Sequence, residues 1–346
     1  MDSLAKIRLE AGSKWFDWKW QFSNRIRTLQ DLSSVIDLTS AEIEAFEKSE
    51  QVFRFASTPY YLNLIDKNNP DCPVRKQIIP SLHEFVQRGT ECEDPLAEEE
   101  FTVENGMIHR FHDRVLWYLS YQCGAYCRFC TRKRKVNDSS SRPGIPERER
   151  GLEYLRQNTN IREVILSGGD PLSLSDGFLK EIIAKIKSIP HINHIRIHTR
   201  IPVVMPMRIT DELCQTFAEH FPVYIVTHFN HPNELTPEAT AALKMLASKG
   251  NCILLNQNVL LSGINDTAET LRELYYNLTA AGVRPYYLHH CDEVYGISAF
   301  RVPYQKGIAI IKELKNTMSG ISVPEFVVDL AGAGGKVPLH SYMTDL

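Results

Sequence analysis

Residues 115–134 read Val-Leu-Trp-Tyr-Leu-Ser-Tyr-Gln-Cys-Gly-Ala-Tyr-Cys-Arg-Phe-Cys-Thr-Arg-Lys-Arg, an apolar run followed at once by three clustered cysteines. The apolar run predicts a strand, and Cys123, Cys127 and Cys130 follow its end in one loop. Thiolate is the ligand that iron–sulfur clusters and zinc both prefer. A structural zinc site adds a fourth protein ligand, often from a second cysteine pair, but the chain has no second Cys-x2-Cys. The loop therefore favours a [4Fe–4S] cluster, with zinc or inert cysteines as the alternatives.

The spacing Cys-x3-Cys-x2-Cys resembles the signature of the radical S-adenosylmethionine (SAM) enzymes. In that superfamily three cysteines hold a [4Fe–4S] cluster, and the amino and carboxylate groups of SAM chelate the iron that they leave open. The resemblance implies a cluster and SAM for this chain, with Cys123, Cys127 and Cys130 as the cluster ligands.

Short apolar or β-branched runs recur beyond this loop and alternate with helix-like segments. After a longer first interval the runs return about every 30 residues, which is the period of a βαβ unit. Because crossovers between such units are right-handed, they build a parallel sheet. We predict an α/β fold, a partial (β/α)6 TIM-like barrel. The strand-like runs are residues 115–121, 162–166, 194–198, 223–226, 252–255 and 284–288, and the helix-like segments are 146–158, 176–188, 210–220, 236–249 and 266–281.

The chain divides into three parts by pattern. Residues 1–105 hold helix-start signals and a tryptophan cluster, residues 106–300 the alternating runs, and residues 301–346 a helix and an apolar strand. We expect an N-terminal helical region, a partial barrel core and a short C-terminal extension. The tryptophans are expected to pack the first region onto its neighbour and not to form a binding surface.

Polar residues follow the end of every predicted strand. In (β/α) barrels the carboxyl ends of the strands form the active-site face, so these residues predict one shared pocket that includes the cluster loop. After the cysteine loop, the ends are residues 167–170 (Ser-Gly-Gly-Asp), 198–200 (His-Thr-Arg), 227–231 (Thr-His-Phe-Asn-His), 256–258 (Asn-Gln-Asn) and 289–292 (His-His-Cys-Asp).

The run Ser167-Gly168-Gly169-Asp170 has two interpretations. Glycines let the backbone approach a ligand closely, and a carboxylate accepts hydrogen bonds from an ammonium group or a ribose hydroxyl. A plain βα turn with an Asp helix cap has the same appearance. Its place one strand after the cysteine loop favours a site for the methionine end of SAM.

Lys336 lies in a second glycine-rich loop, Gly332-Ala-Gly-Gly-Lys336. A Walker A phosphate loop is excluded because it needs Gly at 330 and Ser or Thr at 337, where this chain has Leu330 and Val337. An isolated lysine is normally a solvated surface residue. However, this loop follows the apolar strand 324–329, which suits a lysine delivered into a pocket where burial lowers its pKa for Schiff-base chemistry. Pyridoxal 5′-phosphate (PLP) is then the candidate cofactor.

Motifs spread over residues 60–340 resemble the lysine 2,3-aminomutase family of radical SAM enzymes. They are the cluster loop with Thr131-Arg132, residues 167–171 (SGGDP), 255–260 (LNQNVL), 284–287 (RPYY), and 326–329 (FVVD) with Gly-Gly-Lys336-Val-Pro.

The resemblance implies roles for polar residues of these motifs and of the segment before the first strand. Lys336 would bind PLP covalently, and Arg110 and Arg114 would hold its phosphate. The other cofactor-binding residues would be Ser167, Gly168, Gly169, Asp170 and Gln257. Arg132 would pair with the substrate carboxylate, a bidentate task that suits guanidinium, and Asp292 and Asp329 with the distal ammonium of the substrate.

The implied activity is that of an isomerase in which a 5′-deoxyadenosyl radical from SAM starts migration of an amino group from C2 to C3. Two aspartates favour a substrate with a cationic far end and oppose glutamate. L-Lysine is therefore expected first, interconverted with L-β-lysine, and arginine or ornithine behind it. The branch linked to elongation factor P stays an alternative, although it typically has Phe-Arg-Arg after the third cysteine and lacks the second aspartate. A non-catalytic metal-binding scaffold is a remote alternative.

Longer members of this family carry a cysteine-rich tail that binds zinc. Here the chain ends ten residues after Lys336 and position 267 is Thr, so we expect no zinc. Homo-oligomerisation stays open.

Composition restricts the partners. A net charge of −3 gives no field that attracts nucleic acid. No signal pattern and no run of roughly 20 apolar residues is present, which predicts no membrane association. Three of the eight cysteines act as ligands in this interpretation, which suits a reducing compartment. We expect a cytoplasmic protein that takes a small amino acid and a one-electron reductant such as flavodoxin or ferredoxin.

Overall fold

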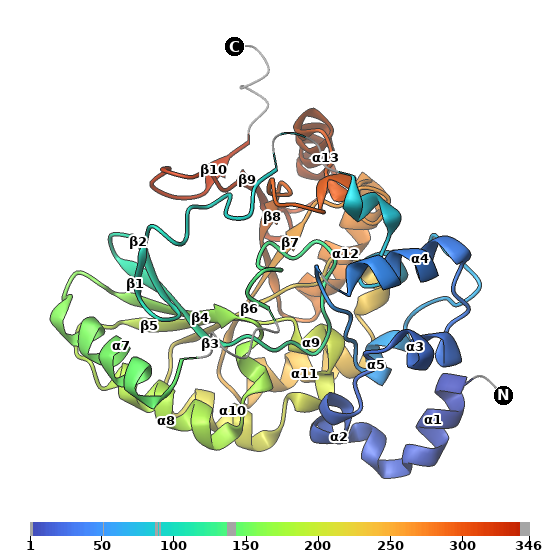
Figure 1. Ribbon diagram of the computed structural model, residues 1–346. Coiled ribbons are helices and arrows are strands. Elements are labelled where there is room, and N and C mark those ends of the chain that lie inside the picture. The colour runs from blue at the N-terminus through green and yellow to red at the C-terminus, as the bar shows by residue number, and fades with distance from the viewer. Residues whose placement is uncertain (1–2, 51, 87–88, 90, 137–142, 340–346) are drawn as a thin grey trace.

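The computed structural model describes all residues except 1–2, 51, 87–88, 90, 137–142 and 340–346. Its centre is a curved ten-stranded sheet whose strands neighbour each other in chain order (Figure 1). Strands β3 to β9 run parallel, and β1, β2 and β10 are antiparallel additions at the two edges. The strands are β1 (Thr102–Glu104), β2 (Met107–Phe111), β3 (Arg114–Ser120), β4 (Glu163–Gly168), β5 (His194–His198), β6 (Val223–Thr227), β7 (Ile253–Val259), β8 (Arg284–His289), β9 (Glu325–Val328) and β10 (Val337–Pro338).

Helices between the parallel strands cover the outer face of the sheet (Figure 1). The predicted partial barrel is confirmed, and each predicted strand and helix is present with small shifts at its ends. The helices of the core are α7 (Ile145–Gln157), α8 (Asp176–Lys187), α9 (Ile201–Val204), α10 (Asp211–Ala218), α11 (Pro237–Ser248), α12 (Ala268–Ala280) and α13 (Tyr304–Thr317).

The sheet is larger than the six predicted strands. The apolar strand foreseen at 324–329 is β9, and it extends the parallel sheet beyond β8. The hairpin of β1 and β2 was not foreseen, because its short, partly charged strands lack a clear apolar alternation.

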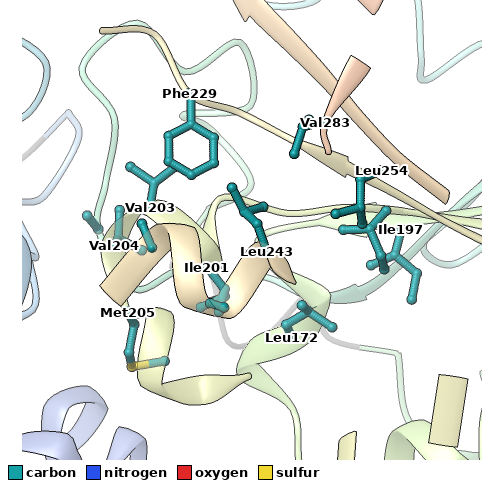
Figure 2. Close-up of a cluster of buried hydrophobic side chains, with 14 of the residues drawn as sticks. Leu172, Ile197, Ile201, Val203, Val204, Met205, Phe229, Leu243, Leu254 and Val283 are labelled. Carbon is teal, nitrogen blue, oxygen red and sulfur yellow. The ribbon is translucent and has the colours of Figure 1, made fainter. Parts of the chain in front are cut away.

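Alternation of side chains along the strands separates the core from the interior of the barrel. In β5, Ile195 and Ile197 are buried in the core, whereas His194, Arg196 and His198 line the central cavity. Figure 2 shows Ile197 and Leu254 in one buried cluster with Leu172, Leu243 and Phe229. Apolar burial of this kind contributes about 1.5–3 kcal/mol for each large side chain.

The N-terminal region is a set of short helices beside the barrel (Figure 1). Trp15 is buried and Arg208 lies 4.5 Å from the ring of Trp18, so the tryptophans serve packing, as expected. The side chain of Thr58 donates to the Val204 carbonyl at 2.5 Å, which ties this region to the core. The division of the chain into three parts stays a prediction. The helices are α1 (Ser3–Ala11), α2 (Trp18–Ser23), α3 (Leu29–Val35), α4 (Ser40–Ser49), α5 (Pro59–Leu62) and α6 (Pro73–Lys76).

None of the helices in the described part of the chain is both long and apolar enough to cross a membrane.

Candidate active site

A cavity of about 970 Å³ lies inside the barrel, and residues from both ends of the parallel strands line it. Every residue to which the sequence analysis gave a site role lines it, as do polar residues from six strands. The shared pocket that the strand ends predicted is therefore present. The lining includes Cys123, Cys127, Cys130, Arg132, Ser167, Gly168, Gly169, Asp170, Gln257, Asp292, Asp329, Lys336, Arg110 and Arg114.

Hydrogen bonds and an ion pair connect the cluster loop to the N-terminal region. The amide of Arg128 donates to the Gln77 carbonyl at 2.8 Å, and the amide of Tyr126 donates to the Ala56 carbonyl at 2.9 Å. The buried Arg128 guanidinium also forms a 2.7 Å ion pair with Glu84. Because these contacts fix both backbone and side chain, the three cysteines project from a supported loop.

The thiols of the cluster loop are packed among apolar side chains. Cys123 and Cys130 contact a cluster that includes Phe53 and Tyr126, and burial raises the pKa of Cys130 to about 11. Among the described residues, no group of three His, Cys, Asp or Glu side chains converges on a single metal ion. Each cysteine of a [4Fe–4S] cluster binds a different iron, so three cysteines on one loop are compatible with such a cluster.

Arg200, which follows β5, is a further residue of the site. It donates to the sulfur of Cys127 at 2.6 Å and forms a 2.7 Å ion pair with the buried Glu234. The sequence placed Arg200 at a strand end, but nothing in it indicated the contact with Cys127, which is 73 positions away.

Gly168 and Gly169 are required by the backbone of the cluster loop. Gly168 has φ +110°, and a Cβ on it would lie 2.6 Å from the Ser120 carbonyl oxygen. A Cβ on Gly169 would lie 2.6 Å from the backbone nitrogen of Gln122. The backbone at the end of β4 therefore lies directly against the start of the cluster loop. Contact of Ser167 and these glycines with a ligand stays a prediction.

Asp170 differs from the expected free acceptor. One carboxylate oxygen accepts from the Thr199 hydroxyl at 2.7 Å, and the other accepts from the Arg200 amide at 2.7 Å. The side chain also accepts from the Leu172 amide, so the helix-cap interpretation describes its contacts. Burial raises the pKa of Asp170 to about 6, and these donors lower it in part.

Lys336 lies at the edge of the cavity between two charged partners. Its ammonium contacts Asp329, which also pairs with Arg110 of β2 at 3.0 Å. Lys336 lines the cavity, as expected of a lysine delivered into a pocket, and its side chain is 30 % exposed, against 6 % for Asp329. Arg110 also donates to the Leu330 carbonyl. This hydrogen bond links β2 to the loop that follows β9 and carries Lys336.

Arg132 is paired with protein groups in this structure. It forms a 2.8 Å ion pair with Glu98, and it donates to the Tyr118 hydroxyl at 2.6 Å. Burial alone would raise the pKa of Glu98, but Arg132 and Tyr118 hold it below its ordinary value. A substrate carboxylate at Arg132 would thus compete with Glu98, a partner that no local sequence pattern revealed.

The remaining predicted residues are less constrained. Arg114 pairs with the neighbouring Asp113 at 2.7 Å. The side-chain nitrogen of Gln257 lies 3.1 Å from Nδ1 of His198. Burial raises the pKa of Asp292 to about 6, with Lys336 acting in the opposite direction.

Several buried nitrogens of the cavity lack partners within the described residues, namely Nε of Arg110, Nε of Arg200, and Nε2 of His198 and of His228. Burial and the nearby Arg200 lower the pKa of His228 to about 3. Unsatisfied donors among fixed cations are what a phosphate or carboxylate group would satisfy. The cavity therefore fits cofactors and substrates that carry such anions.

The fold and the cysteine loop define a radical SAM enzyme, since residues 117–274 match the Radical SAM superfamily. The chain is 44 % identical to an L-lysine 2,3-aminomutase of Fusobacterium nucleatum subsp. nucleatum and 46 % identical to one of Methanococcus maripaludis. Each alignment covers 94 % of this chain and 76 % of the relative. A glutamate 2,3-aminomutase of Clostridioides difficile is 38 % identical over 94 % of this chain and 76 % of its own length. The chain belongs to the lysine 2,3-aminomutase family.

Among solved structures, a radical SAM methyltransferase from Sphaerobacter thermophilus aligns with a TM-score of 0.49 at 15 % identity, over 64 % of this chain and 68 % of the other.

Membership of this family makes the protein an aminomutase, an isomerase that uses a [4Fe–4S] cluster, SAM and PLP. The residues present fit these groups. Three cysteines on one supported loop suit the cluster, and the unsatisfied nitrogens of the cavity suit the phosphate of PLP and the carboxylate of SAM.

Proposed function

We propose that the protein is an L-lysine 2,3-aminomutase, which interconverts L-lysine and L-β-lysine. The observation that carries the proposal is that the cysteine loop, Lys336 and two aspartates, Asp292 and Asp329, line one cavity. The relatives named L-lysine 2,3-aminomutase support the same substrate.

The cofactors would be held by residues from opposite sides of the cavity. Cys123, Cys127 and Cys130 would bind the cluster, Ser167, Gly168 and Gly169 would contact SAM, and Gln257 would contact a cofactor. Lys336 would bind PLP, and Arg110 and Arg114 would hold its phosphate. When bound, these groups supply a hydrogen-abstracting radical and a carbonyl that activates the amino group of the substrate.

The charges around Lys336 give Asp329 two roles. In the structure the Lys336 ammonium and Arg110 neutralise this buried carboxylate. If Lys336 held PLP and Arg110 its phosphate, both cations would be drawn partly away from Asp329. The distal ammonium of lysine would then be a cationic partner for Asp329 and also for Asp292.

The other end of the substrate is assigned to Arg132. Its guanidinium suits a carboxylate, and its present pair with Glu98 keeps it oriented within the cavity. Glutamate is disfavoured as a substrate because its second carboxylate would face Asp292 and Asp329. Arginine and ornithine, which also end in cations, and the branch linked to elongation factor P are the competing assignments.

The direct test is to reconstitute the protein anaerobically and supply L-lysine labelled at its α-nitrogen, with SAM, PLP and a reductant. The expected product is β-lysine with the label on C3, formed faster than any product from arginine, ornithine or glutamate. The Lys336→Ala and Cys127→Ala variants should form none. Faster conversion of another amino acid would replace lysine as the substrate, and turnover by Lys336→Ala would contradict the assigned site.

A further inference from the structure

A second cavity, of about 530 Å³, lies against the cluster loop and shares no lining residue with the active-site cavity. Gln122 and Tyr126 line it, whereas Cys123, Gly124 and Ala125 between them line the active site. The cluster loop is therefore a thin wall between the two cavities.

Three chain segments build this second cavity. Ile26 and Ser57 form an antiparallel bridge, which sets Arg25 and Arg27 beside Arg54 and Phe55. The amide of Tyr126 then joins the cluster loop to Ala56 at 2.9 Å. The cavity is thus a fixed feature of how the N-terminal region packs on the loop.

The lining is strongly cationic. Arg25, Arg27 and Arg54 contribute three positive charges, against one negative charge from Glu50. Arg27 and Arg54 are exposed, and neither has an ion pair or side-chain hydrogen bond within the described part of the chain. We name these three residues the arginine pocket. Its two exposed guanidinium groups are available to an acidic partner.

Arg25 connects the pocket directly to a cluster ligand. It is only 8 % exposed, stacks on the ring of Phe22 at 3.7 Å, and donates to the backbone carbonyl of Cys123 at 2.5 Å. A partner seated on the arginine pocket would therefore contact the side of the cluster loop that Arg25 joins to Cys123.

We propose that the arginine pocket is the docking site of an acidic one-electron carrier protein that reduces the cluster. The inference rests on the proposed function, in which SAM, PLP and the amino acid occupy the active-site cavity and block that approach. The carrier gives up one electron and the cluster gains it, and no bond is made or broken in the transfer. Complementary charge suits a small, transient redox interface.

The test compares two reductants on the reconstituted full-length protein. Reduced flavodoxin is the acidic protein donor, and the reduced methyl viologen cation is the small donor. The double variant Arg27→Glu/Arg54→Glu should be reduced by flavodoxin at least tenfold more slowly at low ionic strength. Reduction by methyl viologen should be unchanged, as followed by loss of cluster absorbance in stopped flow.

The matched control is Lys312→Glu/Lys315→Glu, which makes the same change in net charge at exposed positions of α13. It should be reduced by flavodoxin at the parent rate. Added salt should slow the parent and leave the arginine variant nearly unaffected. The neutral variant Arg27→Gln/Arg54→Gln should give an intermediate rate. It replaces the charge-reversed variant as the test if that variant incorporates less of the cluster.

Three results would overturn the proposal: an unchanged flavodoxin rate in both arginine variants, equal slowing in the control, or equal slowing with methyl viologen. A dimer of this chain that dissociates in the arginine variant would also overturn it, by showing that the pocket is a subunit interface. No amino acid is present in the assay. Failure to convert lysine in a separate assay would reject the proposed substrate, whereas these rates report only on reduction of the cluster, so the two failures are distinguishable.

Discussion

At the residue scale, the buried carboxylates of the site depend on the cations around them. Asp329 contacts both Lys336 and Arg110, and Asp292 stands in the same cavity without an ion pair among the described residues. A buried carboxylate is stable in its ionised form only while a cation lies nearby. A ligand that takes up one of these cations must therefore supply another.

Asp329→Asn tests the assigned substrate contact. Loss of a hydrogen bond to a charged group should lower kcat/KM for L-lysine roughly 10- to 100-fold. Asp211→Asn, which removes an exposed pair with Lys249, should leave kcat/KM unchanged. Steady-state kinetics measure kcat/KM of both variants. An unaltered kcat/KM in Asp329→Asn would show that this residue does not contact the substrate.

Asp292 predicts a dependence on pH. Its pKa is raised by burial to about 6, so the carboxyl takes up a proton at higher pH than an ordinary Asp. Only the ionised form binds ammonium, so kcat/KM for L-lysine should fall about tenfold per pH unit well below pH 6. Because the pKa of Asp292 is higher in the folded than in the unfolded state, its proton stabilises the folded state at acidic pH. This contribution to the free energy of unfolding is lost as the pH rises through about 6.

A profile of kcat/KM against pH measures this effect. Asp292→Asn should be slower throughout and should lose the acidic limb. If the limb persists in Asp292→Asn, another group controls it.

Arg200 should tune the cluster. Its guanidinium donates to the Cys127 sulfur, and hydrogen bonds to cluster sulfurs help to set the reduction potential. Arg200→Lys keeps a charge for Glu234 but loses the planar fork. We expect a more negative midpoint potential in a redox titration followed by EPR, with full iron content. A potential equal to that of the parent would limit Arg200 to packing.

At the element scale, the cluster loop depends on contacts that are remote in sequence. Arg128 lies between two cluster cysteines, yet its partners are Glu84 and the Phe53 carbonyl. Its guanidinium is 1 % exposed, so it needs a counter-charge.

Glu84→Gln should therefore destabilise the protein by about 3–5 kcal/mol, since it leaves Arg128 buried and uncompensated. Glu44→Gln, which breaks an exposed pair with Lys48, should cost about 0–1 kcal/mol. Denaturant unfolding measures both, and iron content should fall in Glu84→Gln alone. Equal stability of the two variants would show that the loop does not depend on this ion pair.

Elements with a strong local pattern were predictable from the sequence. The apolar run before the cysteines is β3, and the recurring runs after it are β4 to β8. The hairpin of β1 and β2 was not predictable, because it depends on pairing with β3 and not on its own alternation.

At the whole-molecule scale, the parallel topology explains why the predicted site residues meet. Strand ends that lie more than 150 positions apart in sequence, such as Cys130 and Asp292, reach one cavity because the strands run parallel in order. The residues that support them were hidden from sequence. Glu98 at Arg132, Glu84 at Arg128 and Tyr61 at Arg200 are long-range pairs, and no local spacing marks such pairs.

The N-terminal region serves the site from outside the barrel. It supplies Tyr61 and Gln77 to Arg200, Glu84 to Arg128, and Arg25 to the Cys123 carbonyl. The same region that stabilises the cluster loop also forms the arginine pocket, so cluster support and access for the electron donor are properties of one interface.

The central claim is that Lys336 holds PLP in the cavity that also contains the cluster loop. Borohydride reduction of the PLP-loaded protein, followed by peptide mass mapping, tests it most directly. We expect a pyridoxyl group on the peptide that contains Lys336, and none on that peptide in Lys336→Arg. Modification of a different lysine in the parent protein, with Lys336 unmodified, would contradict it.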